Sequence, residues 1–219
     1  MRVCCRLVPS LLRFAERVAD ARSTEPALLK NFQFMPSSPA SRTLRLAEER
    51  DIPALETLVE VSVRALLSRC YSAAQLEVAL GPVFGVDAQL IRDGTYFVVE
   101  RGSDFIACGG WSRRRAVYGG DRDRADEDEE LNLQTDAARV RAFFVHPAWE
   151  RRGIGRRLLL ESEAAIRVAG FKRIELVATL AGEPLYAAHG YSVAERYEAP
   201  MPGGLTLAVV RMTKSLSPG

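Results

Sequence analysis

Residues 139–169 read RVRAFFVHPAWERRGIGRRLLLESEAAIRVA and predict a strand, a glycine- and arginine-rich turn and a helix. The apolar run Val140–Val145 predicts the strand, and apolar residues at helical spacing from Gly153 to Ala169 predict the helix. Gly153 and Gly155 carry no Cβ that would keep a ligand away from the backbone. Because the first N–H groups of a helix lack intrahelical partners and lie at its positive end, the turn predicts a site for an anion, such as phosphate.

Four arginines crowd this turn, and guanidinium forks suit phosphate oxygens; they are Arg151, Arg152, Arg156 and Arg157. Two common phosphate motifs are excluded. A P-loop needs Gly-Lys-Ser/Thr, whereas Gly155 is followed by two arginines and Leu158. A dinucleotide-binding turn needs a third glycine where Leu158 stands and a tight exit from the strand, whereas seven residues separate Val145 from Gly153. The turn alone leaves open a plainer interpretation, a helix start eased by glycine with solvated arginines.

Motifs on both sides of the turn resemble the GCN5-related N-acetyltransferase (GNAT) family in order and spacing. They are Val145-His146-Pro147, the Arg-Arg-Gly-Ile-Gly-Arg turn, the amphipathic helix, the strand Arg173–Ala178 and Leu185-Tyr186-Ala187-Ala188-His189-Gly190-Tyr191. The resemblance covers about Thr43 to Met212 and is strongest from Arg141 to Tyr191. One residue departs from it, because the family usually has Gln or Arg three residues before the first glycine, where this chain has Glu150.

The resemblance implies that acetyl-coenzyme A is the co-substrate and that an amine attacks the thioester directly, without an acyl-enzyme. In the family the strand matching Val140–Val145 splays from the strand matching Arg173–Ala178, and the pantetheine arm lies in that wedge. The Val145 N–H would also polarise the thioester carbonyl. The cofactor-binding residues implied in this chain are Phe143, Phe144, Val145, Arg151, Arg152, Gly153, Ile154, Gly155 and Arg156.

Tyr186 is the catalytic side chain that the resemblance implies, since it occupies the family's tyrosine position, four residues before Gly190. Its phenol would protonate the departing thiolate of coenzyme A, and a reference pKa of about 10 keeps it protonated at neutral pH. The alternative is a packing tyrosine, the role expected of Tyr191. A general base stays unassigned: Glu100 and Glu175 are candidates, but each can equally face solvent or pair with an arginine.

The composition limits the other classes of function. The chain has 219 residues, 47% of them hydrophobic, which is enough for one good core, and it contains no apolar run long enough to span a membrane. A net charge of +2 does not indicate nucleic-acid binding. Four cysteines without a Cys-x-x-Cys pattern fit a reducing cytoplasm, and Cys108 is expected in the core. His146 and His189 lack metal-ligand spacing, so no metal is expected.

The element order predicts a single α/β (α+β) domain with a mixed, mostly antiparallel central sheet flanked by helices, as in the GNAT-like acyl-CoA N-acyltransferase fold. Strands are expected at about 43–48, 96–100, 105–111, 140–145, 173–178 and 206–212, and helices at about 52–67, 72–80, 153–169 and 183–188. Residues 1–41 are expected to be a poorly ordered extension, with Met35 an alternative start, residues 42–214 the acetyltransferase domain, and residues 215–219 a tail.

These observations predict an N-acetyltransferase that acts on the primary amine of a small molecule or of a protein. A non-catalytic acyl-coenzyme A binding or sensing module is the alternative, motivated by Glu150 and by the missing base. A homodimer is a further expectation, whereas nucleic acid and membrane partners are not expected. Residues 121–130 hold seven acids, which would either attract a cationic acceptor or form a solvated loop.

Overall fold

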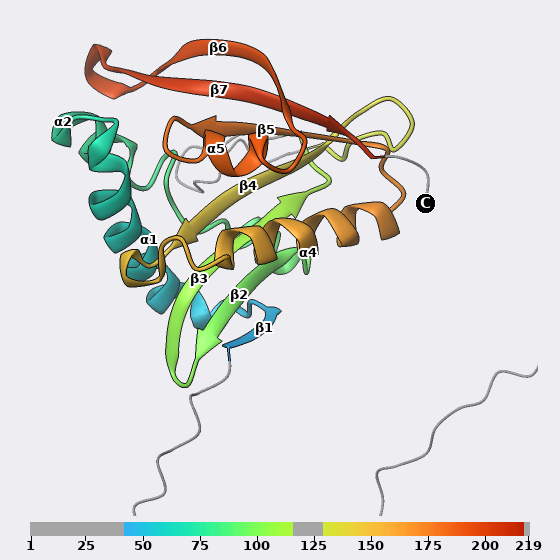
Figure 1. Cartoon of the computed structure of the whole chain (residues 1–219), viewed down its shortest axis with the longest axis horizontal. Coiled ribbons are helices and arrows are strands. Elements are labelled where there is room, and N and C mark those ends of the chain that lie inside the picture. The colour runs from blue at the N-terminus through green and yellow to red at the C-terminus, as the bar shows by residue number, and fades with distance from the viewer. Residues whose placement is uncertain (1–41, 116–128, 217–219) are drawn as a thin grey trace, which may run out of the picture. The chain divides into compact units, whose positions relative to one another are not determined.

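The computed structural model describes residues 42–115 and 129–216. Its described part is built on one seven-stranded sheet with the order β1-β2-β3-β4-β5-β7-β6 (Figure 1). Only β4 and β5 pair in parallel, and the other neighbouring strands are antiparallel. The strands are β1 (Arg42–Leu46), β2 (Tyr96–Arg101), β3 (Asp104–Ser112), β4 (Ala138–Val145), β5 (Arg173–Thr179), β6 (Ser192–Pro200) and β7 (Thr206–Ser215).

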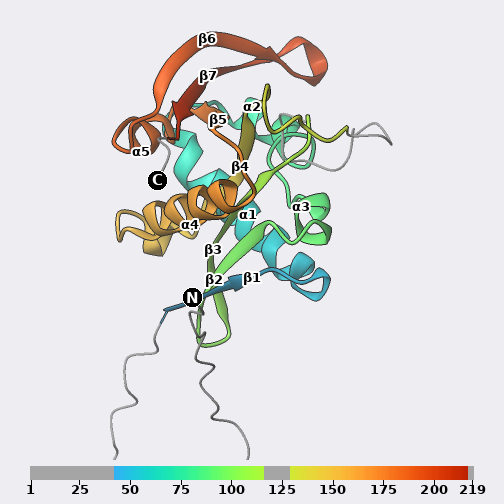
Figure 2. The same cartoon turned by 90° about the vertical axis from the view of Figure 1, so that its right-hand side faces the viewer.

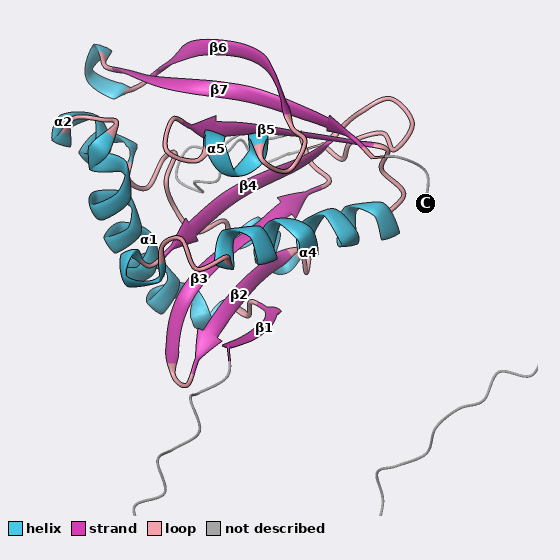
Figure 3. Cartoon of the chain, viewed as in Figure 1, coloured by secondary structure: helices cyan, strands magenta, loops and turns pink. Residues whose placement is uncertain are grey.

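Helices cover both faces of the sheet, as the turned view in Figure 2 and the secondary-structure colours in Figure 3 show. The α-helices are α1 (Ile52–Leu66), α2 (Ala73–Ala79), α3 (Ala88–Arg92), α4 (Ile154–Val168) and α5 (Glu183–Ala187). The chain also forms short 3-10 turns: η1 (Glu49–Asp51), η2 (Leu67–Arg69), η3 (Pro147–Trp149) and η4 (Pro202–Gly204).

Two apolar clusters follow from the alternation of side chains along the strands. Phe97 and Val99 of β2 pack in one cluster with Leu158 of α4. Val98, between them, points to the other cluster together with Leu55 of α1. The sheet is therefore buried on both faces, with α4 on one side and α1 on the other.

The strands β4 and β5 pair only at their beginnings. Their register joins Ala138 to Ile174 and Arg139 to Glu175, and no further pair follows. On its other edge β4 carries a bulge, because the register against β3 shifts between Cys108 and Gly110. Beyond these pairs β4 and β5 diverge and leave a wedge between them. The wedge lies at the end of the sheet where α4 and α5 start (Figure 1).

The predicted fold class is confirmed, and most expected elements lie within two or three residues of their predicted bounds. Two elements were not predicted, the short helix α3 and the edge strand β6. The strand β6 is mostly exposed and carries charged residues such as Glu195 and Arg196, so it lacks the apolar alternation that marks a half-buried strand. Val61, an apolar residue of α1, is 37% exposed and lies outside the core.

Residues 1–41, 116–128 and 217–219 lie outside the described residues. The expectations about the amino-terminal extension, about Met35 and about most of the acidic segment 121–130 fall on these ranges and stay predictions. In the described part of the chain, no helix is both long and apolar enough to cross a membrane.

Candidate functional site

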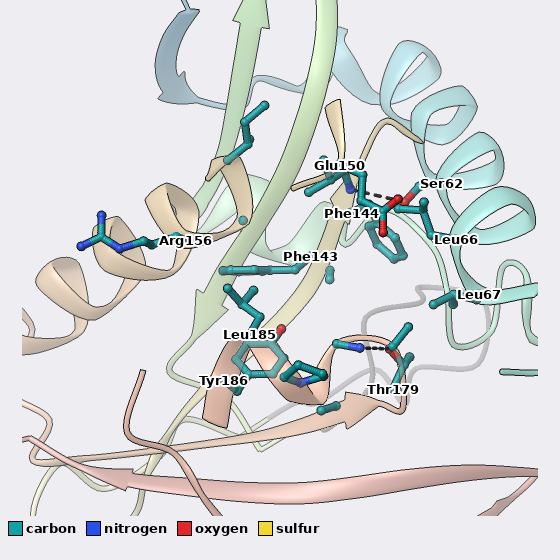
Figure 4. A pocket seen from close by; sticks show the side chains of 18 of the residues that line it. Ser62, Leu66, Leu67, Phe143, Phe144, Glu150, Arg156, Thr179, Leu185 and Tyr186 are labelled. Atoms are coloured by element: carbon teal, nitrogen blue, oxygen red, sulfur yellow. Dashed lines mark hydrogen bonds between the residues drawn. The ribbon is translucent and has the colours of Figure 1, made fainter. Parts of the chain in front are cut away.

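A cavity of about 740 Å³ lies in the wedge between β4 and β5. At one end it is lined by the start of α4 and by α5, through residues such as Gly155 and Leu185. At the other end it is lined by α1, η2 and the loop between α2 and α3, through residues such as Leu66 and Phe84. Figure 4 shows the ring of Phe143 between these two ends.

The edge of β4 that faces the wedge offers backbone groups to a ligand. Phe143 and Val145 pack with the α4 cluster, whereas Phe144 packs with the α1 cluster, so the strand alternates normally here. The His146 N–H donates to the Ile106 carbonyl of β3, whereas the Val145 N–H donates away from β3, so by alternation the Phe144 N–H faces β3. The open edge therefore carries the N–H groups of Phe143 and Val145, and Phe144 lines the cavity with its side chain.

The N–H of Val145, which the resemblance assigned to the thioester carbonyl, donates a hydrogen bond to the Ser62 hydroxyl at 3.3 Å. Ser62 is a buried polar residue on the core-facing side of α1. It was missed at the sequence level, although a serine within an otherwise apolar helix stripe is a signal that could have found it. A ligand that takes the Val145 N–H would replace this hydrogen bond.

The bulge in β4 depends on one unusual backbone conformation and on one missing side chain. Ala142 has a φ of 59°, which is uncommon for a residue other than glycine. Gly109 of β3 lies opposite, and a Cβ there would meet the Phe143 ring at 2.3 Å. The missing side chain at Gly109 therefore lets the Phe143 ring fill the space beside the wedge. Strained residues of this kind often accompany functional sites.

The turn before α4 has the geometry of an anion site. Gly153 adopts a φ of 77° as the N-cap of α4, and a Cβ at this position would meet nothing within 4 Å. The first intrahelical bond runs from the Arg157 N–H to the Gly153 carbonyl, so the N–H groups of Ile154, Gly155 and Arg156 have no intrahelical acceptor. These donors lie at the cavity wall, where the helix dipole favours negative charge.

The arginines of the turn divide into two groups. Arg151, with a φ of 60°, and Arg156 line the cavity. Figure 4 shows the Arg156 side chain extending away from Phe143 and from the centre of the cavity. Arg152 is not among the lining residues. Its guanidinium lies 4.9 Å from the centre of the Trp149 ring, and Arg101 lies 5.2 Å from the same ring. Arg152 was expected to bind the cofactor, and the structure does not bring it into the cavity.

Glu150, the residue that departs from the family pattern, also lines the cavity. Its carboxylate accepts two hydrogen bonds from Arg69 of η2, at 2.8 and 3.0 Å. Because the two groups carry opposite charges, the Arg69 guanidinium partly neutralises the negative charge of Glu150 beside the anion site. Arg69 lies eighty-one residues away in the sequence, and no local signal predicted the pair.

Tyr186 of α5 lies in the wall of the same cavity and is 8% exposed. Its ring packs 6.4 Å from Phe143 and 5.8 Å from Tyr191, between ring centroids. Within the described residues, no hydrogen bond engages its phenol. Burial raises the pKa of Tyr186 above the ordinary phenol value, which keeps the hydroxyl protonated at neutral pH. Tyr191 is buried behind it, as expected of a packing residue.

The two candidate bases do not lie in the cavity wall. Glu100 pairs with Arg45, and Glu175 pairs with Arg139 and Arg211. Both carboxylates therefore make the arginine pairs that were the alternative at the sequence level. Among the described residues that line the cavity, Glu150 is the only acid.

The cysteines divide by exposure. Cys108 is fully buried, as expected, and burial raises the pKa of its thiol to about 12. Cys70 is exposed and lines the cavity at the η2 end, which the sequence did not indicate. His189 also lines the cavity, and its Nδ1 lies 2.7 Å from the Leu185 carbonyl oxygen. In residues 42–115 and 129–216, no group of three or more His, Cys, Asp or Glu side chains could hold a metal ion.

Part of the chain that lines this cavity matches a model of a known protein family. Residues 92–193, from the end of α3 to the start of β6, match the family model described as the acetyltransferase (GNAT) domain. These residues supply β4, β5, α4 and α5, which form most of the wedge. The resemblance to the GCN5-related N-acetyltransferase family is thereby confirmed. None of the curated proteins compared with the chain matches it.

Solved structures share the fold at low sequence identity. A GCN5-related N-acetyltransferase from Rhodopseudomonas palustris is 17% identical with a TM-score of 0.60, over 82% of this chain and 98% of that one. The PaiA N-acetyltransferase from Thermoplasma acidophilum, solved with coenzyme A, is 15% identical with a TM-score of 0.59, over 80% and 99%. YncA from Salmonella typhimurium, described as a putative acetyltransferase with its cofactor acetyl-CoA, is 16% identical with a TM-score of 0.55, over 82% and 96%.

Proposed function

We propose that this protein is an N-acetyltransferase that transfers the acetyl group of acetyl-coenzyme A to a primary amine by direct attack in a ternary complex. The observation that carries the proposal is the wedge between β4 and β5. Open-edge N–H groups, a glycine turn at a helix N-terminus and the Tyr186 phenol line one continuous cavity there. The family match and the fold neighbours that bind coenzyme A or acetyl-coenzyme A support it.

The residues present fit acetyl-coenzyme A. The diphosphate would lie against the N–H groups of Ile154, Gly155 and Arg156, with Arg151 beside it, because these donors lack intrahelical acceptors. The pantetheine amides would bond the open edge of β4 at Phe143 and Val145, in the manner of an added strand. Because Gly153 has no Cβ and a positive φ, the backbone of the turn is open to the ligand.

The acyl-transfer step balances without a covalent enzyme intermediate. The neutral amine nitrogen forms a bond to the acetyl carbon, the bond from that carbon to sulfur breaks, and the amine loses one proton to water. Tyr186 gives its phenolic proton to the departing thiolate and regains a proton from solvent. The N–H groups at the open edge of β4 would stabilise the negative charge that develops on the carbonyl oxygen.

A covalent route through a cysteine has little support in the structure. The Cys108 thiol is buried and its raised pKa keeps it protonated. Cys70 reaches the cavity, so Cys70→Ser provides the direct test. Direct attack predicts that this variant keeps its turnover and that double-reciprocal plots at several amine concentrations intersect, whereas an acyl-enzyme predicts parallel lines and loss of turnover.

Calorimetry with acetyl-coenzyme A and release of coenzyme A across a panel of primary amines test the proposal together. Tight binding with acetylation of any amine in the panel supports the transferase. Tight binding without turnover on any amine would instead favour the alternative, a non-catalytic acyl-coenzyme A binding module. Absence of binding would overturn both.

A further inference from the structure

The cavity continues beyond the part assigned to acetyl-coenzyme A. Past Phe143 it runs to the end of α1, to η2 and to the loop between α2 and α3. Figure 4 shows Leu66 and Leu67 facing this end, across from Phe143 and Tyr186. We call this region the α1 end of the cavity. On the proposed function, it is the space left for the acceptor amine.

The walls of the α1 end are mostly apolar. Phe84 and Phe144 are buried, and the other apolar side chains here are only partly exposed. They come from five separate segments of the fold: Leu66 from α1, Leu67 from η2, Val83 and Phe84 from the loop after α2, Phe144 from β4 and Val177 from β5. A ligand at this end therefore gains free energy mainly by burying apolar surface.

The charged groups at the α1 end are already paired. Glu150 accepts two hydrogen bonds from Arg69. Arg141 pairs with the buried carboxylate of Asp87 at 2.9 Å. Among the described residues that line the cavity, Glu150 is the only carboxylate for a second ammonium group on an acceptor, and Arg69 already holds it. An acceptor carboxylate would find Arg69 held by Glu150. Either charge would lose its hydration without gaining a partner of its own.

We propose that the acceptor is a primary amine carried on an apolar, uncharged group, and that the α1 end binds this group. The inference rests on the proposed function and names its substrate class. It also accounts for the missing general base. An apolar environment disfavours the charged form of a bound amine, so the neutral nucleophile forms without a carboxylate on the strands facing it.

Amines matched in size but not in charge test the proposal. Hexylamine, cadaverine and γ-aminobutyrate have similar lengths, and the latter two add an ammonium and a carboxylate. We expect kcat/KM for hexylamine to exceed that for either charged amine by at least about tenfold, because the second charge loses hydration. From propylamine to hexylamine, kcat/KM should rise about fourfold for each added methylene group, as for burial of apolar surface.

A variant with a matched control tests where the carrier group binds. Leu66→Asp places a carboxylate in the wall of the α1 end, and Val61→Asp places one on the exposed side of the same helix. We expect Leu66→Asp to shift the preference toward cadaverine by at least about tenfold, because the new carboxylate pairs with the second ammonium. Val61→Asp should keep the wild-type order.

Alkylation of Cys70, followed by mass spectrometry of its peptide, reports occupancy of the α1 end without turnover. Hexylamine should slow alkylation of Cys70, and cadaverine at the same concentration should not. Acetylation that prefers cadaverine or γ-aminobutyrate, an unchanged preference in folded Leu66→Asp, or no protection of Cys70 at saturating hexylamine would overturn this inference while leaving the transferase assignment intact. Absence of both acetyl-coenzyme A binding and acetylation would overturn the proposed function, and this inference with it.

Discussion

The two ends of the cavity are lined by different chemical groups. At the α4 end, the part of the wall that faces an anion is made of backbone N–H groups and of the glycines at 153 and 155, which come from one continuous turn. At the α1 end, side chains from α1, η2, β4, β5 and the loop after α2 form the wall. A site made of backbone has a local sequence pattern, because glycine is required at defined positions. A site made of apolar side chains uses the same residues as any core and has no such pattern.

Blocking the glycine turn should produce the largest effect, at the α4 end alone. We expect Gly153→Val to weaken acetyl-coenzyme A binding by at least about 100-fold, about 2.7 kcal/mol, because a branched side chain holds the diphosphate off the helix N–H groups. Calorimetry measures the dissociation constant.

Gly170→Val is the matched control for this variant. Gly170 also has a positive φ, 93° against 77° for Gly153, but it lies just beyond the other end of α4. Both variants should lose similar stability from backbone strain, about 1 to 2 kcal/mol. Equal losses of affinity in the two variants would mean that strain, rather than access to the turn, explains the result.

Tyr186 belongs to α5, at the α4 end of the cavity, and its hydroxyl should matter to turnover rather than to binding. We expect Tyr186→Phe to lower kcat by roughly 10- to 1000-fold with little change in acetyl-coenzyme A affinity, since only the proton donor is removed. Tyr191→Phe, a buried tyrosine packed against it, is the control and should keep most of its turnover. Wild-type kcat in folded Tyr186→Phe, with chemistry shown to limit the rate, would assign Tyr186 to packing.

The pH profile gives a second test of Tyr186. Burial raises the pKa of its phenol, and the acid form is the one that donates a proton. A phenol of ordinary pKa would begin to lose its proton as the pH approaches about 10, so kcat would begin to fall. With the pKa raised, kcat should stay level up to that pH. A fall between about pH 8 and pH 10 that is absent from Tyr186→Phe would contradict the raised pKa.

Removing the Tyr71 hydroxyl should lower the stability of the fold without changing acetyl-coenzyme A binding at the α4 end of the cavity. The phenol of Tyr71, just after η2, donates to the Ala208 carbonyl of β7 at 2.8 Å and accepts from the Leu180 N–H at 2.9 Å. We expect Tyr71→Phe to lower the free energy of unfolding by about 1 to 3 kcal/mol, because two partners lose their hydrogen bond. Denaturant unfolding measures this loss, and an unchanged dissociation constant for acetyl-coenzyme A is the accompanying expectation.

The smallest effect is expected from the ion pair of Arg69 and Glu150. Both side chains are partly in solvent, so screening limits the contribution of the pair. Arg69→Ala leaves the Glu150 charge beside the anion site, and we expect acetyl-coenzyme A to bind about two- to fivefold more weakly, more so at low salt. Adding Glu150→Gln to this variant should restore the affinity. An equally weak double variant would show that Arg69 contacts the cofactor itself.

The predictions from sequence were likewise more accurate for features with a local sequence pattern, such as the α4 end of the cavity, than for features formed by distant segments. The run from β4 through α4 to β5 was predicted closely, because an apolar strand, a glycine turn and an amphipathic helix each have a local signal. The strand β6 was missed because it is a charged, exposed edge strand recognised only by its pairing with β7. Tyr186 was assigned from the family resemblance, through its position four residues before Gly190, whereas Ser62 and Arg69 reach the cavity through contacts across the chain.

Some features of this protein can therefore be predicted from local sequence patterns, and others depend on its tertiary structure. The elements from β4 to α5, the glycine turn before α4 and, through the family resemblance, Tyr186 can be predicted from residues 139–191, because their patterns depend on neighbours within a few positions along the chain. The apolar α1 end, the pairing of Glu150 with Arg69 and the exclusion of Arg152 from the cavity depend on packing between segments far apart in sequence. Side-chain packing is non-local and follows shape and burial, so only the folded chain shows which apolar residues line a cavity and which fill the core.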